Sequence, residues 1–346
     1  MMDNNKLFLS VIIPCRNEEK FIGECLDSVL AQDYSREKME ILVVDGLSQD
    51  KTREIVGQYK KKNNFIRLLD NPKKVTPVAM NIGLRAAKGE AMTMISAHCI
   101  LDEKFLSSGA EYLDKFCAAD AVGGALKTIN DEKNIIAQAI PLAADSSFGT
   151  GGNRYRTRVE AGFINDTLPY AIYRRELFAR IGYIDEELIR DQDEEFNYRI
   201  LNHGGRIYFT PKIKSFLHIR PSLLKLWRQH FQYGYWKVKV ITKVGIGSVK
   251  KQLVPGLFVA GLLGSLTLSL FWKPFLWLFA AIAGVYLAVN LFFSAKIAAR
   301  YGLKFFFALL VSFFILHFSY GLGFLNGVLD FSFLKKKGIR DVPLTR

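Results

Sequence analysis

Three long stretches without Asp, Glu, Lys or Arg, near the carboxyl end of the sequence, limit what this chain can fold into. Leu253–Trp272 and Pro274–Phe293 are 20 residues each, and Phe305–Leu329 is 25 residues. About 20 apolar residues in a helix cross the hydrocarbon core of a bilayer, and core helices of soluble proteins rarely lack a polar face over that length. The first two stretches therefore predict membrane spans. The third predicts either a span or a re-entrant hairpin, because its second half contains Tyr320, Gly321, Gly323, Asn326 and Gly327.

Basic residues next to these stretches predict their sidedness. The net charge is +14. Lys237, Lys239, Lys243, Lys250 and Lys251 precede the first stretch, and Lys296, Arg300 and Lys304 separate the second from the third. By the positive-inside rule these flanks are cytoplasmic and the short turn at Lys273 is outside. Because the charge gathers beside apolar segments, it favours a lipid bilayer as partner and not nucleic acid.

The first 250 residues are expected in the cytoplasm. Met1–Lys6 is polar, and Leu7–Pro14 is too short for the apolar core of a secretory signal. The four cysteines have no paired or zinc-ligand spacing, which fits reduced thiols. A conflict concerns the tail that contains Lys335, Lys336, Lys337 and Arg340. Three full spans would place this tail outside, against the charge rule, whereas a re-entrant third stretch would keep it inside; the sequence leaves both open.

The amino-terminal part alternates predicted strands and helices. Strands are predicted at 7–14, 40–44, 65–69 and 91–95, and helices at 18–32, 51–62 and 77–87. Such alternation with short connections predicts an α/β fold with a doubly wound, mostly parallel, Rossmann-like sheet. Ligands bind beyond the carboxyl ends of the strands in such sheets. Three polar groups follow strand ends there: Asn17–Glu18, Asp45 and Ser96–Ala97–His98.

Later segments complete the predicted organisation. Gly149–Arg158 is a basic loop, Asp191–Leu201 begins a helix with acidic residues, and 222–244 mixes aromatic and basic residues as interfacial helices do. We therefore predict a catalytic domain over 1–220 and an amphipathic interfacial segment over 221–252. A membrane domain over 253–334 and a basic tail over 335–346 follow.

Several motifs together resemble family 2 glycosyltransferases of the GT-A fold, and most closely the succinoglycan-biosynthesis type of bacterial polysaccharide transferases. They are VIIPCRNEE (11–19), VVDGLSQDKT (43–52), NPKKVTPVAMNIGLRAAKGE (71–90), the stretch from Gly149 through 173–211, and WRQHFQYGYWK (227–237). The resemblance covers roughly residues 8–240. It implies an inverting transferase that uses a nucleotide-diphosphate sugar.

The resemblance implies donor-binding residues at the strand ends. Asp45 would accept a hydrogen bond from a uracil N–H, within a pocket formed by Pro14, Asn17 and Glu18, with Asp50 beside it. Asn81, Ser96 and Ala97 would also line the donor site. The plain alternatives are a turn-forming Asp-Gly for Asp45, a helix cap for Asp50 and a surface Asn in mid-helix for Asn81.

A divalent cation, Mn²⁺ or Mg²⁺, is implied at the donor diphosphate, where the family has Asp-x-Asp or Asp-x-His. This chain has Ser96–Ala97–His98, so the first carboxylate is missing and His98 is the candidate ligand. A single imidazole would favour Mn²⁺ over Mg²⁺. The alternative is a structural, hydrogen-bonded His98.

The resemblance makes Asp193 the candidate general base, which would take the acceptor hydroxyl's proton during in-line attack. The family usually has Glu-Asp where this chain has Gln192–Asp193, and the alternative is an acidic helix cap. Arg154 and its neighbours Arg156 and Arg158, with Arg199 and Gln232, are candidates for phosphate or acceptor contacts; a solvated basic loop is equally open for the first three. Trp236 would stack on the acceptor sugar or anchor in the interface. QYGYW (232–236) lacks the arginines of processive members, which favours a non-processive enzyme.

The leading hypothesis is therefore a multi-pass protein of the inner membrane. It would transfer a sugar, from UDP by family prevalence, to a lipid-linked glycan at the cytoplasmic face, in cell-surface polysaccharide synthesis. One alternative is a polyprenyl-phosphate glycosyltransferase. Another is a catalytically silent scaffold, which Ser96 and Gln192 motivate. The identity of the sugar, the acceptor and the oligomeric state stay open.

Overall fold

The structure, a computed structural model, describes residues 7–129, 134–149, 154–157, 159–218 and 222–334. The chain divides into two compact units. The first contains residues 1–127 and 154–218, and the second contains 128–153 and 219–346. The predicted boundary near residue 220 thus falls at the end of the first unit, but the segment 128–153 groups with the carboxyl-terminal helices. This grouping has a physical reason, because the apolar helix in this segment buries Ala139, Ile140 and Ala143 in the core of the second unit.

The first unit is built on one mixed sheet, which has nine strands within the described residues. The strands are β1 (Leu9–Cys15), β2 (Met39–Asp45), β3 (Ile66–Asp70), β4 (Ala91–Met94), β5 (Cys99–Leu101), β6 (Ala121–Ile129), β7 (Gly162–Ile164), β8 (Ile172–Arg174) and β9 (Ile207–His218). Their order is β3-β2-β1-β4-β8-β6-β9-β5, and β7 pairs with β9.

The four strands predicted from the sequence form the parallel half of this sheet. β1 pairs in parallel with β2 and β4, and β2 pairs in parallel with β3. The other pairs for which a register is known are antiparallel: β4–β8, β6–β8, β5–β9 and β7–β9. The expectation of a mostly parallel sheet is therefore wrong beyond β4. Strands β5, β7 and β8 are three residues each, too short for a period-two pattern to predict them.

Helices cover both faces of the sheet, as a doubly wound fold requires. They are α1 (Ile22–Leu30), α2 (Thr52–Lys62), α3 (Thr76–Ala86), α4 (Phe105–Lys115), α6 (Arg154–Thr157), α7 (Arg175–Ile181) and α8 (Gln192–Asn202), with the 3₁₀ turn η1 (Arg36–Lys38). Along β1 the side chains alternate between two cores. Val11 and Ile13 pack with α1, α2 and α4, whereas Ile12 packs with α3, α7 and α8. The predicted helices and parallel strands agree with the structure to within about four residues at each end.

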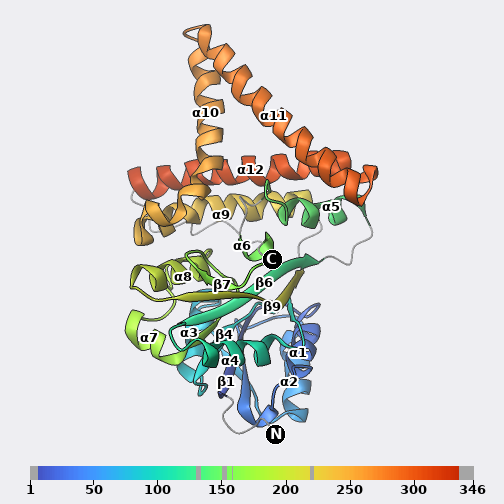
Figure 1. The fold of residues 1–346 in the computed structure, drawn as a ribbon, viewed down its shortest axis with the longest axis vertical. Coiled ribbons are helices and arrows are strands. Elements are labelled where there is room, and N and C mark those ends of the chain that lie inside the picture. The colour runs from blue at the N-terminus through green and yellow to red at the C-terminus, as the bar shows by residue number, and fades with distance from the viewer. Residues whose placement is uncertain (1–6, 130–133, 150–153, 158, 219–221, 335–346) are drawn as a thin grey trace. The chain divides into compact units, whose positions relative to one another are not determined.

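The second unit is helical. It contains α5 (Ile135–Ala144), α9 (Leu223–Val244), η2 (Ile246–Leu253), α10 (Val254–Ser269), α11 (Pro274–Tyr301), η3 (Leu303–Phe305), α12 (Phe306–Val328) and η4 (Leu329–Phe333). Figure 1 shows α10 and α11 as a hairpin, and α12 lying beside α9. Within the described part of the chain, three segments are long and apolar enough to cross a membrane: Lys250–Ser269, Pro274–Tyr301 and Leu303–Phe333.

The third apolar stretch is a single continuous helix, so the predicted break at its glycines does not occur. These glycines serve close packing instead. A Cβ on Gly323 would lie 2.0 Å from the carbonyl oxygen of Phe231, and one on Gly321 would lie 2.4 Å from that of Pro255. The predicted basic tail 335–346 lies outside the described residues.

Candidate active site

The predicted donor site lies where β1 and β2 end side by side. Pro14 pairs with Val44, and Cys15 pairs with Asp45 at the last position of both strands. Beyond this pair, Asn17 and Leu47 have left-handed backbone conformations, with φ of 53° and 54°. The two loops therefore turn sharply at the carboxyl edge of the sheet, which is where the sequence predicts ligand binding.

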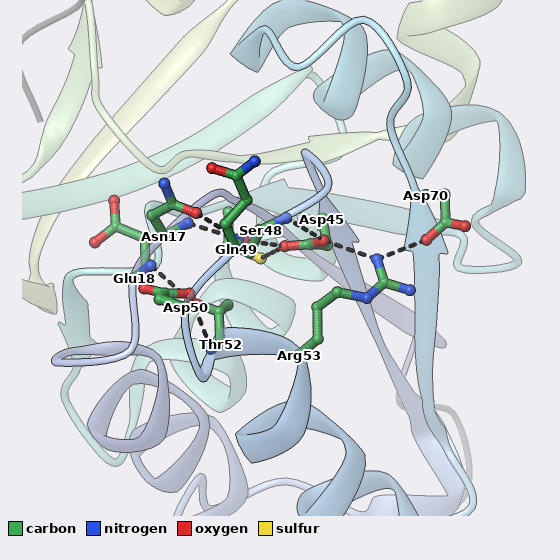
Figure 2. Close-up of polar contacts among 10 residues, drawn as sticks. Asn17, Glu18, Asp45, Ser48, Gln49, Asp50, Thr52, Arg53 and Asp70 are labelled. Atoms are coloured by element: carbon green, nitrogen blue, oxygen red, sulfur yellow. Dashed lines mark hydrogen bonds and ion pairs between the residues drawn. The ribbon is translucent and has the colours of Figure 1, made fainter.

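Hydrogen bonds join these two loops to each other (Figure 2). The Asn17 N–H donates to Ser48 Oγ at 2.8 Å, and the Gln49 N–H donates to Asn17 Oδ1 at 2.9 Å. The Glu18 N–H donates to Thr52 Oγ1 at 2.8 Å. Asn17 and Glu18 thus hold the loop that precedes α2.

Asp45 is fully buried and organises this edge. Its Oδ2 accepts from the Ser48 N–H at 3.0 Å and from Arg53 Nη1 at 2.8 Å, and its Oδ1 accepts from the Ser48 hydroxyl. Arg53 bridges to the exposed Asp70 at 2.8 Å (Figure 2). The Asp45 side chain therefore fixes the loop internally. A direct bond from Asp45 to a uracil N–H stays a prediction, and would have to share oxygens that are already engaged.

Asp50 adopts the cap-like arrangement that the sequence left open. Its Oδ1 accepts from the Thr52 N–H at 3.0 Å and from Thr52 Oγ1 at 2.6 Å, at the start of α2. Its Oδ2 accepts from the Glu19 N–H at 3.2 Å. Burial acts to raise the pKa of Asp50, but these hydrogen bonds outweigh it and lower the pKa below its ordinary value.

Asn81 is buried, so it is not the surface side chain considered as its alternative. Its Nδ2 donates to the Ile184 carbonyl at 2.8 Å and to Glu186 Oε1 at 3.0 Å, and its Oδ1 accepts from the Ile184 N–H at 3.0 Å. Both ends of the amide thus hold the loop that precedes α8. Glu186, whose pKa is lowered first by the bond from Asn81, also pairs with Lys73 at 3.3 Å.

Ser96, Ala97 and His98 follow β4 on the same edge. Ser96 Oγ lies 2.8 Å from the Tyr170 hydroxyl, and Ala97 is buried. The His98 side chain is 32% exposed, and its Nδ1 lies 3.6 Å from Glu18 Oε1. The structure thus brings His98 to the loop of Asn17 and Glu18, as the sequence predicted for the strand ends.

The site has three further polar residues that the sequence analysis missed: Tyr170, His218 and Glu24. His218 ends β9, where its N–H donates to the His98 carbonyl at 3.1 Å and its Nε2 lies 3.0 Å from Glu24 Oε2. The Phe21 ring lies 5.1 Å from the His218 ring. The sequence contains little to identify His218 as a site residue. It lies next to His98 through the antiparallel β5–β9 pair, which no local sequence pattern predicts.

These residues fit a divalent cation only in part. Among the described residues, no three His, Cys, Asp or Glu side chains are grouped as a metal site. Two neighbouring pairs have suitable donor atoms, an imidazole and a carboxylate: His98 with Glu18, and His218 with Glu24. We consider the first pair further because His98 follows β4 at the predicted donor edge. A cation there would take its remaining ligands from a bound diphosphate and water.

Asp193 lies in the first turn of α8 and is exposed to solvent. The residue before the helix, Asp191, has a left-handed backbone with φ of 58°. Burial raises the pKa of Tyr173, and the negative charge of Asp193 raises it further. An exposed carboxylate at a helix start has the access that a general base needs.

One short segment connects the β4 end to this helix. The Tyr170 hydroxyl contacts Ser96, and the Leu168 carbonyl accepts from Asn197 Nδ2 at 3.0 Å. The same Asn197 nitrogen donates to the Asp193 carbonyl at 2.7 Å. Residues 168–170 therefore join the predicted donor edge to the predicted base through hydrogen bonds.

The remaining candidates are those predicted for phosphate or acceptor contacts. Arg199 forms a bidentate pair with Glu195 at 2.8 Å for each bond, and donates to the carbonyls of Ile181 and Tyr183 at 2.9 Å. It is a structural link and not a free cation for phosphate. Arg154 begins α6, but its side chain and residues 150–153 and 158 of the predicted loop lie outside the described part.

Gln232 and Trp236 belong to α9 in the second unit and are both buried. The Trp236 ring packs 5.7 Å from Tyr235 and 5.9 Å from Phe331. Both roles predicted for Trp236, stacking on the acceptor and anchoring in the interface, require an accessible ring. In this structure Trp236 is a packing residue.

Strained backbone gathers near the predicted site residues. Within the described ranges five non-glycine residues have a left-handed backbone: Asn17, Leu47, Lys74, Tyr170 and Asp191. Four of them adjoin or contact predicted residues, namely Asn17 itself and the neighbours of Asp45, Ser96 and Asp193. Conformations of this kind persist where the surrounding structure enforces them, and they concentrate at functional sites.

Comparison with known proteins identifies the family to which this chain belongs. The model of glycosyl transferase family 2 matches residues 10–182, which contain β1 to β4 with the donor edge and Tyr170. The chain belongs to glycosyl transferase family 2. It is thus an inverting glycosyltransferase, as the motifs predicted, and the resemblance to the succinoglycan type is confirmed.

Two relatives extend over much of the chain. A Methanococcus voltae enzyme named dolichyl N-acetyl-alpha-D-glucosaminyl phosphate 3-beta-D-2,3-diacetamido-2,3-dideoxy-beta-D-glucuronosyltransferase is 32% identical over 247 residues, 68% of this chain and 74% of its own. Succinoglycan biosynthesis protein ExoA of Rhizobium meliloti (strain 1021) is 27% identical over 324 residues, 93% of this chain and 95% of its own.

Solved structures with the same fold support the GT-A assignment. The mannosyltransferase PcManGT of Pyrobaculum calidifontis, in complex with GDP-Man and Mn²⁺, has a TM-score of 0.59 at 19% identity and covers 94% of this chain and 88% of its own. Residues 1–349 of S. aureus TarS in complex with UDP-GlcNAc have a TM-score of 0.54 at 19% identity, and 92% of each chain is covered.

Proposed function

We propose that this enzyme transfers a sugar from a UDP-sugar to a lipid-linked glycan at the cytoplasmic face of the inner membrane. The observation that carries the proposal is that one chain joins a family 2 transferase domain to three helices of membrane-crossing length. The name of the Methanococcus relative describes transfer to a dolichyl N-acetylglucosaminyl phosphate, which is a lipid-linked sugar. A membrane-held catalyst would meet such an acceptor in the plane of the bilayer.

In the proposed reaction, Asp193 accepts the proton of the acceptor hydroxyl as that oxygen attacks the anomeric carbon of the donor. The new glycosidic C–O bond forms on the face of the anomeric carbon opposite the bond to the diphosphate. That second bond breaks, and the nucleoside diphosphate leaves with its electron pair. Asp193 is suited to this role because it is exposed at the start of α8, a helix held to residues 168–170 through Asn197. Ser96 and Tyr170 hold the neighbouring strand end in place.

The donor diphosphate carries the charge that the reaction must neutralise. We assign His98 and Glu18 as the protein ligands of a divalent cation, with Mn²⁺ preferred because of the imidazole. When bound, such an ion stabilises the negative charge of the leaving diphosphate. Two protein ligands hold an ion weakly, so we expect it to bind together with the donor.

The test is donor turnover in detergent with UDP-glucose, UDP-galactose, UDP-N-acetylglucosamine and GDP-mannose, in Mn²⁺, Mg²⁺ or EDTA. We expect one UDP-sugar to be turned over, faster in Mn²⁺ than in Mg²⁺, with activity lost in EDTA. Activity that survives EDTA would support the transferase activity but contradict a required divalent cation. Binding of donors without any transfer or hydrolysis, across all metals and with membrane lipid added, would contradict the proposal.

The base is tested with a matched pair of variants. Asp193→Asn keeps the shape of the side chain and is expected to lower kcat by at least about 10²-fold with donor affinity unchanged, because general-base catalysis contributes about 10²–10⁴-fold. Glu194→Gln, which removes the next carboxylate of the same turn, is expected to retain activity. Loss of donor affinity in Asp193→Asn would assign the residue to donor binding instead.

The product distinguishes the two acceptor classes. A disaccharide-linked lipid formed from a prenyl-linked sugar supports the proposed glycan acceptor. A monosaccharide joined directly to a polyprenyl phosphate would identify the lipid phosphate as acceptor instead.

A further inference from the structure

The membrane topology of the second unit follows from which helices lie side by side. Helix α9 itself is unsuited to cross a bilayer. Its 22 residues include five basic side chains: Lys225, Arg228, Lys237, Lys239 and Lys243. Lys225, Arg228 and Lys243 are exposed and Lys239 is half-buried, so each of these four would have to leave water for hydrocarbon, which is unfavourable for a charged group. Lys237 is already buried within the protein. A helix with this mixture of basic and aromatic residues is stable along the membrane surface.

Helix α12 runs parallel to α9 and in contact with it (Figure 1). The Trp227 and Phe318 rings lie 6.2 Å apart near the start of this contact, and the Trp236 and Phe331 rings lie 5.9 Å apart near its end. Residue numbers rise together along both helices. From Trp227 to Trp236 the contact extends along α9 for about 15 Å.

Glycines bring the two helices close along this contact. A Cβ added at Gly234 of α9 would lie 2.0 Å from the Tyr320 carbonyl oxygen. On α12, a Cβ at Gly323 would lie 2.0 Å from the Phe231 carbonyl oxygen, and one at Gly327 would lie 2.5 Å from that of Tyr235. Backbone contacts this close fix the direction of α12 to that of α9, so α12 cannot cross a bilayer unless the basic helix α9 crosses with it.

The end of α12 carries a polar contact that agrees with this placement. Asp330, directly after α12 in η4, is buried and accepts a hydrogen bond from the Tyr235 hydroxyl of α9 at 3.0 Å. Burial within the structure also separates the three apolar segments. In the most apolar 18-residue stretch of each segment, the buried share is 44% for the segment that contains α12, 17% for the segment that contains α10 and 6% for α11. Helices α10 and α11 therefore present most of their surface outward, as lipid-facing helices do.

The α10–α11 hairpin has the length and the tip of a membrane crossing. Helix α10, with 16 residues from Val254 to Ser269, extends about 24 Å, and the turn after it brings the hairpin near the thickness of about 30 Å of a hydrocarbon core. At the tip, Phe271, Trp272 and Trp277 are exposed next to Lys273. Aromatic rings beside a basic residue are typical of the membrane–water interface.

We infer that the α10–α11 hairpin crosses the bilayer, and that α12 lies flat beside α9 on the cytoplasmic surface, so that both ends of α12 stay on one side. The partner is an anionic lipid surface. A cytoplasmic end of α12 agrees with the positive-inside rule, because the sequence after residue 334 contains Lys335, Lys336, Lys337 and Arg340. The inference rests on the proposed membrane association and does not depend on the proposed transfer reaction.

The experiment labels single cysteines with a membrane-impermeant maleimide in intact spheroplasts and again after permeabilisation. Cys15, Cys25 and Cys99 are buried, and the exposed Cys117 marks the cytoplasmic side in the unaltered chain. In a Cys117→Ser background, Lys273→Cys reports the hairpin tip and Ser332→Cys reports the far end of α12, both at exposed positions. We expect Lys273→Cys to be labelled in intact cells, and Ser332→Cys only after permeabilisation.

Labelling of Ser332→Cys in intact cells would mean three crossings and would overturn the inference. Lys273→Cys that stays unlabelled in intact cells would show that the hairpin does not cross, which also overturns it. Carboxyl-terminal fusions to green fluorescent protein and to alkaline phosphatase give an independent result, since fluorescence supports a cytoplasmic end and phosphatase activity contradicts it. Sidedness is measured without turnover, so an inactive enzyme leaves this result intact.

Discussion

Asp45 shows how one residue can organise the predicted donor edge without facing solvent. It is fully buried, and Ser48 and Arg53 engage its two oxygens, so its charge holds the loop on which Asn17, Gln49 and Asp50 also depend. The same Arg53 pairs with Asp70, whose side chain is 58% exposed. The two carboxylates thus share one partner in very different surroundings, and a comparison between them isolates the effect of burial.

We expect Asp45→Asn to lower the free energy of unfolding by about 1–3 kcal/mol, because a buried charge-assisted hydrogen bond is lost and the new amide N–H₂ faces donors. Asp70→Asn, its control, is expected to cost less than about 1 kcal/mol, since exposed ion pairs contribute little. Thermal unfolding in detergent measures both, and donor binding should weaken in the first variant alone. Equal stability of the two variants would show that Asp45 is not a structural anchor of the site.

Asp50 predicts a contribution to stability that depends on pH. Its pKa is lowered in the folded chain, so the unfolded chain binds a proton at higher pH than the folded one. This stabilisation is complete above the unfolded pKa and disappears as pH falls through the folded pKa. At pH 7 we expect the free energy of unfolding of Asp50→Asn to be lower than that of the wild type. Between about pH 5 and pH 3 the free energy of unfolding of the wild type should fall more steeply than that of Asp50→Asn, and acid-unfolding curves of the two chains measure this difference.

At the scale of elements, local patterns predicted the parallel half of the sheet and its helices, because each has enough residues to show a period. They did not predict the antiparallel half, whose short strands owe their position to β4 and β9. For the same reason His98 was predicted at a strand end, whereas His218 and Tyr170, which reach the edge through β9 and a loop, were not. The glycines of α12 predicted a break as one alternative, which the continuous helix contradicts. Their role in packing depends on a partner helix that no local pattern identifies.

The glycine contacts of α12 make a direct prediction. Gly323→Ala should lower the stability of the membrane unit by about 1–3 kcal/mol, because the new Cβ would overlap the Phe231 carbonyl and the backbones would have to separate. Gly284→Ala in α11 is the matched control, since a Cβ there has no neighbour within 4 Å in the described chain. It should be neutral or stabilising by up to about 1 kcal/mol through helix propensity. Thermal unfolding in one detergent compares the two, and a Gly323→Ala chain as stable as its control would show that the close α9–α12 contact is absent.

At the scale of the whole molecule, the chain combines a transferase domain with a helical second unit, and we infer that only part of the apolar sequence in this unit faces lipid. Length and hydropathy identify three candidate spans, and they cannot tell a helix that contacts lipid on all sides from one that packs along an interfacial helix. The difference lies in the contacts with α9, which bring basic side chains alongside α12. A hairpin anchor of this kind would hold the enzyme at the bilayer while both ends of the membrane unit stay in the cytoplasm.

Charge substitution separates these two environments. Leu263→Lys places a cation near the middle of the outward face of α10, where insertion should cost about 2.5–3.5 kcal/mol. Val311→Lys places the same cation on the outward face of α12, at a similar exposure of 44% against 42%. If α12 lies at the surface, the second lysine reaches water and the carbonate-resistant membrane fraction should be unchanged, whereas the first should lower it several-fold. Equal losses from both variants would mean that Val311 lies in hydrocarbon and that α12 crosses the bilayer.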